Sequence, residues 1–143
     1  NVSMEGGGIK AASDAALFSV ASETLTVAGV TIAESSGASI PDSSDTSGDG
    51  IVAIRGADAA AWGVSVFHVR VTDSVFTDNN RAAVLLEDVS YSLMGNTASG
   101  GLEEGGTSFF AQGGAAEEAV GDTVAAPSTD LDLNVSSLTA TVE

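Results

Sequence analysis

The 143-residue chain has no cysteine, only two prolines and four basic residues, and aromatic residues make up 5% of it. Without cysteine, neither disulfide bonds nor thiolate-bound metal sites can form. No run approaches the roughly 18 apolar residues of a membrane-spanning helix, which predicts no membrane insertion. The remaining composition, rich in Ala, Val, Ser and Thr with 17 glycines, favours short strands and small-residue turns over long helices.

Acidic residues outnumber basic ones by 20 to 4, which gives a formal net charge of −16. Such a surface repels phosphates and anionic lipid headgroups, so we expect no nucleic-acid partner. It attracts cations instead, and a chain this poor in lysine stays hydrated at high salt, which indicates a marine or halophilic source. Asn1 and Asn134 each begin an N-x-S sequon, which permits glycosylation if the chain is exported.

An internal repeat is the strongest signal. Residues 25–38, LTVAGVTIAESSGA, align without a gap to residues 69–82, VRVTDSVFTDNNRA, at an offset of 44. A fainter copy at residues 91–93, YSL, follows after 22 residues, with Gly95 and Asn96 as turn residues. The pattern predicts coils of 22 residues, each with about three short strands, so that the 44-residue offset spans two coils.

These stretches resemble the repeats of right-handed parallel β-helix proteins, of the surface-exported passenger and pectate-lyase-like type. The resemblance covers roughly residues 7–100 and lies in the Gly-Gly-x-Ile opening and the Asn-rich turns. It implies an all-β, right-handed parallel β-helix. An antiparallel β-sandwich or jelly roll is the alternative, although neither would repeat in register at 44 residues.

In a β-helix the apolar side chains of the short strands point inward, and each coil is covered by the next. The predicted core residues are Val27, Ile32, Val71, Phe76, Val84, Leu86 and Leu93. The predicted organisation is β-helix coils over 1–100 with a loop insertion at 33–50, a Gly/Ala/Glu-rich excursion over 101–130, and one or two terminal strands over 131–143. Phe109 and Phe110 are expected to attach the excursion to the solenoid.

One motif indicates a metal. Asp45, Ser47 and Asp49, followed by Gly50, resemble the start of an EF-hand calcium loop, in which alternating oxygens surround the ion and the glycine permits a sharp turn. Asp42 and Asp58 are additional candidate ligands. The position of the bidentate acid is Gly56, which departs from the pattern. The alternative interpretation is a solvated acidic loop.

Other polar residues are interpreted mainly as structural. Glu34 and Asp78 are expected two coils apart, hence about 10 Å from one another. His68 and Arg70 should face outward without catalytic roles, and Asn79, Asn80 and Asn96 should satisfy buried turn carbonyls. Arg70, Asp73, Asp78 and Arg81 form the one group that could imitate a lyase site.

The sequence therefore predicts a non-enzymatic extracellular structural or adhesive module, part of a larger surface protein, an appendage or a virion spike. Its expected partners are other copies or further segments of the same assembly, with glycan as a further candidate. The alternatives are a carbohydrate-active β-helix enzyme, a lyase or hydrolase with two carboxylates in a groove, and a calcium-dependent adhesin. No catalytic residue is assigned, and Ca²⁺ is the one cofactor considered.

Overall fold

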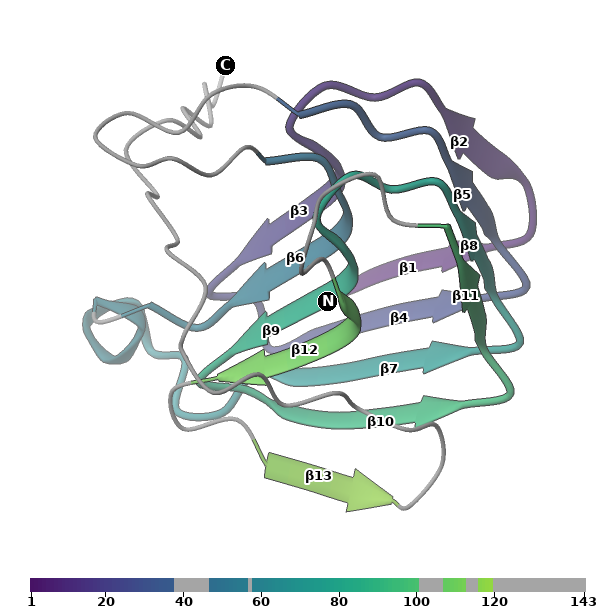
Figure 1. Ribbon diagram of the computed structural model, residues 1–143. Coiled ribbons are helices and arrows are strands. Elements are labelled where there is room, and N and C mark those ends of the chain that lie inside the picture. The colour runs from purple at the N-terminus through teal and green to yellow at the C-terminus, as the bar shows by residue number, and fades with distance from the viewer. Residues whose placement is uncertain (38–46, 57, 101–106, 113–115, 120–143) are drawn as a thin grey trace.

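The computed structural model describes residues 1–37, 47–56, 58–100, 107–112 and 116–119, and within them short strands form three parallel sheets (Figure 1). The five-stranded sheet contains β1 (Val2–Glu5), β4 (Thr24–Ala28), β7 (His68–Thr72), β10 (Ser90–Met94) and β13 (Ala116–Ala119). The short-strand sheet contains β2 (Gly8–Lys10), β5 (Thr31–Ala33), β8 (Val75–Thr77) and β11 (Thr97–Ser99). The long-strand sheet contains β3 (Ala15–Val20), β6 (Asp49–Ile54), β9 (Ala82–Glu87) and β12 (Thr107–Gln112).

The chain visits the three sheets in turn, so that β1, β2 and β3 make one coil and β4, β5 and β6 make the next. Each strand pairs with its counterpart in the neighbouring coil, and all pairings between the described strands are parallel. The fold is the predicted right-handed parallel β-helix. The antiparallel sandwich is therefore wrong for this part of the chain.

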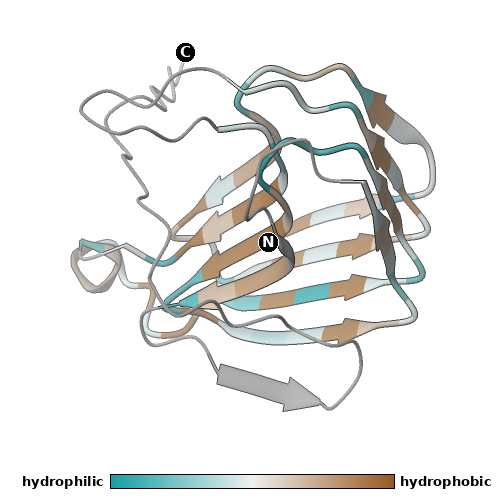
Figure 2. Cartoon of the chain, viewed as in Figure 1, coloured by the Kyte–Doolittle hydropathy of each residue, from teal (hydrophilic) through white to brown (hydrophobic). Residues whose placement is uncertain are grey.

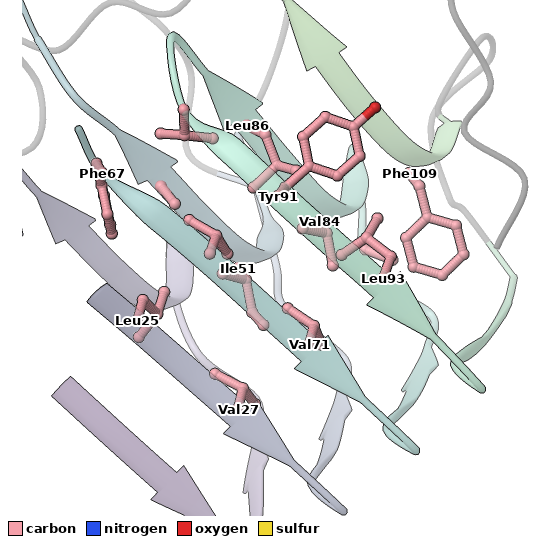
Figure 3. Packing of buried hydrophobic residues seen from close by; sticks show 14 of the residues in the cluster. Leu25, Val27, Ile51, Phe67, Val71, Val84, Leu86, Tyr91, Leu93 and Phe109 are labelled. Carbon is pink, nitrogen blue, oxygen red and sulfur yellow. The ribbon is translucent and has the colours of Figure 1, made fainter. Parts of the chain in front are cut away.

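Apolar side chains fill the interior of the coils. In β4 and β7 exposure alternates along the strand, because every second side chain points inward. The close view in Figure 3 shows side chains of successive strands converging on one interior, and in Figure 2 brown bands alternate with white or teal ones along strands such as β7. The seven predicted core residues are all confirmed as buried: Val27, Ile32, Val71, Phe76, Val84, Leu86 and Leu93.

The two central strands of the long-strand sheet, β6 and β9, are buried on both faces. Every residue of β6 is buried, and so is every residue of β9 except Glu87. Outward-facing side chains there form a second apolar cluster, made of Val52, Ile54, Ala82, Leu85 and Phe110. This two-sided burial explains why both strands have nearly continuous apolar sequences instead of alternating ones.

The repeat was detected correctly, but its length was misinterpreted. Val27 pairs with Val71 in the adjacent strand, and Val71 pairs in turn with Leu93. The 44-residue and the 22-residue offsets are therefore each one coil. Glu34 and Asp78 accordingly lie in adjacent coils, whose paired strands are about 4.8 Å apart. The prediction that they lie two coils apart was wrong.

Two insertions produced the misinterpretation. The offset between paired residues is 23 for β2 and β5, 34 for β3 and β6, and 44 for β4 and β7. About eleven additional residues therefore lie between β5 and β6, and ten more between β6 and β7. Together they are nearly as long as one coil, so a single enlarged coil has the length of two.

The predicted segments can be located relative to the strands. The expected insertion at 33–50 begins within β5 and ends within β6, and its residues 38–46 lie outside the described ones. The expected excursion at 101–130 contains β12 and β13, which pair with β9 and β10 and continue the solenoid. Phe109 and Phe110 are buried there as predicted. The terminal strands expected at 131–143 lie outside the described residues.

Buried polar side chains join the turns of neighbouring coils. The Asn96 amide oxygen accepts the Ser74 N–H at 3.0 Å, and the Ser74 hydroxyl accepts the Val30 N–H at 3.2 Å. At the next turn of the coil, the Asn79 amide oxygen accepts the Ser35 N–H at 3.4 Å. The Asn96 and Asn79 amides also donate to the carbonyls of Val71 and Ile32, at 2.9 and 3.4 Å, which confirms the predicted structural role of these two side chains. Unpaired backbone groups in these turns would otherwise be costly.

The corrected register makes a testable prediction about coupling. Val27→Ala and Val71→Ala remove side chains in contact across adjacent coils, so we expect a coupling free energy of about 0.5–3 kcal/mol in a double-mutant cycle measured by chemical denaturation. Val27→Ala and Leu93→Ala lie two coils apart and share only the contact with Val71, so their coupling should be smaller than that of the first pair. Additivity in the first pair would argue against the adjacent-coil register.

Candidate functional site

Of the five residues predicted to bind calcium, the structure describes Ser47, Asp49 and Asp58. Asp49 is the first residue of β6, and Asp58 follows after the end of this strand, which is about 16 Å long. Asp42 and Asp45 lie outside the described residues. Within the described ranges, no group of three or more His, Cys, Asp or Glu residues could hold a metal ion. Calcium binding by the predicted motif stays a prediction.

Asp49 forms a buried ion pair with Arg81 of the neighbouring coil. The guanidinium donates from Nε to Oδ1 at 3.0 Å and from Nη2 to Oδ2 at 2.6 Å. The Ala82 N–H also donates to Oδ1, at 3.1 Å. The Asp49 and Arg81 side chains are only 1% and 4% exposed. Both carboxylate oxygens therefore serve a bidentate pair between coils, a geometry for which arginine is suited.

The described end of the first insertion is fastened to the preceding coil. The Asp14 carbonyl accepts the N–H groups of Gly48 and Asp49, both at 2.8 Å. The Ser47 hydroxyl donates to the Asp14 carboxylate at 2.7 Å, and the Asn80 amide donates to the Ser47 carbonyl at 2.9 Å. These groups hold the chain where it returns to the solenoid.

Gly50 has a different role from the predicted one. It lies inside β6, where a Cβ atom would come within 2.4 Å of the Ala83 carbonyl oxygen and 2.9 Å of the Phe76 ring. The absence of a side chain allows close packing against these groups. The left-handed conformation belongs to Gly48 instead, with φ of +113°.

The buried ion pair predicts a large effect on stability. Arg81→Met leaves the Asp49 carboxylate buried without its partner, and we expect a loss of about 3–5 kcal/mol in the free energy of unfolding. Lys10→Met removes the exposed pair with Glu34 and should change it by no more than about 1 kcal/mol. Denaturant titrations of both variants measure the difference. Equal effects would show that burial of the Asp49 pair is unimportant.

The residues that could imitate a lyase site do not converge. Arg70 lies within β7, Asp73 and Asp78 lie in the turns before and after β8, and Arg81 is committed to Asp49. The structure therefore places these four residues along more than half a coil, with one of them buried in another interaction.

Two further acids are paired with basic residues at the surface. Lys10 lies 2.9 Å from Glu34, and the Arg55 Nε lies 2.9 Å from the Asp88 carboxylate. With Arg81 bound to Asp49, three of the four basic side chains have a carboxylate partner. The acidic turns are thus partly neutralised across coils.

The second insertion, residues 55–67, presents an exposed tryptophan and is named the Trp62 loop. It contains η1 (Ala59–Trp62), and the described residues of the loop project beside the sheets at the left of Figure 1. Trp62 is 66% exposed and Val66 is 56% exposed. Tryptophan is one of the residue types that most often dominate the binding energy of protein interfaces.

The Trp62 loop is anchored at several points. Ala59, Val64 and Phe67 are buried in the main core, and Gly63 closes η1 in a left-handed conformation. The Arg55 guanidinium donates to the Ser65 carbonyl at 3.1 Å while it also holds Asp88. The tryptophan is therefore presented by a fixed backbone.

The outer face of β7 continues from this loop. Exposure alternates from Val66 to Arg70, so His68 and Arg70 face outward as predicted, and Phe67 and Val69 face inward. The His68 Nδ1 lies 2.9 Å from the Ser90 hydroxyl of the next coil. Sequence reasoning missed the Trp62 loop, because a single tryptophan gives no sign of its exposure. The mismatch between the 44- and 22-residue offsets was the one available signal of an insertion.

Among the described residues, the structure contains no helix long and apolar enough to cross a membrane. Comparisons of this chain with protein-family models, with curated proteins and with solved structures found no match. The site must therefore be interpreted from its own geometry.

Proposed function

We propose that this chain is a non-enzymatic structural and adhesive module of a larger extracellular or surface protein, which presents the Trp62 loop from a rigid solenoid. The observation that carries the proposal is the combination of an exposed Trp62 with a loop anchored by three buried residues and by Arg55. A tryptophan presented in this way loses little conformational freedom when it binds, which favours adhesion.

The rest of the solenoid fits a supporting role. Its buried polar groups, such as Asp49 with Arg81 and Asn96 with Ser74, join coils to one another. Repeated parallel stacking produces a stiff, extended surface on which loops keep fixed positions. The proposed partners are other copies or segments of the same assembly, and glycans, whose C–H faces can pack on an aromatic ring.

Removing the tryptophan side chain tests the proposal. Labelled wild-type chain and Trp62→Ala are applied to an array of neutral and acidic oligosaccharides and to a surface coated with the unlabelled chain. We expect Trp62→Ala to bind at least about tenfold more weakly, because exposed tryptophans often dominate contact energies. Its thermal unfolding should match that of the wild type, since Trp62 is mostly exposed.

Val75→Ala is the matched control, because it also removes an exposed apolar side chain but lies on the short-strand sheet. It should bind as the wild type does. Equal binding by Trp62→Ala, or no wild-type binding to either surface, would contradict an adhesive role. Release of shortened oligosaccharides from the array would favour the enzyme alternative instead.

A further inference from the structure

Within the part of the chain that the structure describes, Arg70 is the one basic residue without a carboxylate partner. It lies in β7, at the centre of the five-stranded sheet, with its side chain exposed on the outer face. Its register partners are Thr26 in β4 and Ser92 in β10. Paired residues of parallel strands point to the same face about 4.8 Å apart, so two hydroxyls flank the guanidinium.

Ser92 is an unusual neighbour. Its residue is only 5% exposed, and its hydroxyl takes part in none of the hydrogen bonds of the described residues. Among the described residues its oxygen is not one of the wholly buried side-chain atoms that lack a partner, so water still reaches this hydroxyl, and an acceptor supplied by a ligand can replace that water. The same row of the sheet thus holds an uncommitted cation and an uncommitted hydroxyl.

The row beside it extends the array. His68 lies two residues before Arg70 on the same face, and it contacts the Ser90 hydroxyl. These two rows contain six outward-facing residues, which we call the donor patch: Thr24, Thr26, His68, Arg70, Ser90 and Ser92. None of them carries a negative charge, in a chain whose formal net charge is −16.

We propose that the donor patch binds a single sugar carboxylate, namely one uronic acid unit within an otherwise neutral oligosaccharide. The proposal rests on the adhesive function above and specifies a ligand class for the face next to the Trp62 loop. The planar guanidinium of Arg70 matches a carboxylate with two parallel hydrogen bonds. The hydroxyls and His68 match the hydroxyl groups of a sugar ring.

A peptide carboxylate fits this face less well. Strands β4 and β10 flank β7 on both sides, so the backbone groups of β7 are already used in the sheet. An extended peptide binds most readily by adding a strand to a free edge, and β7 lies in the middle of its sheet. A polyuronate is disfavoured for another reason, because the net charge of −16 repels a chain of carboxylates.

Calorimetric titration of the folded chain tests the proposal, with methyl glucuronide as the probe and methyl glucoside as its neutral counterpart. We expect binding of methyl glucuronide alone. Arg70→Gln should weaken it at least about tenfold, since it removes a charge-assisted bidentate contact. Ser92→Ala should weaken it by a smaller factor, about two- to fivefold. Lys10→Gln removes one exposed positive charge elsewhere and should stay within about twofold of the wild type.

Several results would overturn the proposal. These are no binding of methyl glucuronide, equal binding by Arg70→Gln, or acetate and sulfate binding as tightly as the sugar, which would indicate an anion site only. Tighter binding of polygalacturonate per uronate unit would contradict recognition of a single carboxylate. Adhesion through Trp62 is measured in a separate experiment. It can therefore persist when methyl glucuronide does not bind the donor patch, and a loss of adhesion does not alter the result of the titration.

Discussion

In-register stacking of coils is the constraint on which the rest of the structure depends. No coil can bury its inward side chains alone, and Val27, Val71 and Leu93 illustrate how each is covered by its counterpart in the next coil. The same stacking places turn residues above one another, so Asn79 and Asn96 reach the backbone of the neighbouring coil. Polar and apolar contacts therefore support a single register, and a slip would disrupt both together.

The sequence predicted the fold and the core because both depend on local alternation. The seven predicted core residues were identified by period-two patterns that survive any error in coil length. The coil count failed because two insertions add nearly one coil between the paired Leu25 and Val69. The candidate site was missed for a related reason. The exposure of Trp62 depends on how Ala59, Val64 and Phe67 pack, and sequence spacing does not contain that information.

Charge is distributed unevenly for a physical reason. A chain with 20 acids and four bases needs its few cations wherever a carboxylate would otherwise be buried or crowded. Arg81 neutralises Asp49 inside, while Arg55 and Lys10 serve Asp88 and Glu34 at the surface. The outward rows around Arg70 contain hydroxyls and a histidine instead of acids, so Arg70 has no carboxylate to neutralise within these rows.

Both insertions flank β6, a strand buried on both faces. Its pairing with β3 and β9 fixes the position of β6 whatever the length of the connections before and after it. Longer connections therefore cost little stability, because loop-closure entropy rises slowly with length. A loop placed there can project from the solenoid while its ends remain rigid. The Trp62 loop combines these properties, and it leads directly into the outward row of β7. Rigidity in the stacked coils and exposure in the loop are thus two consequences of one arrangement.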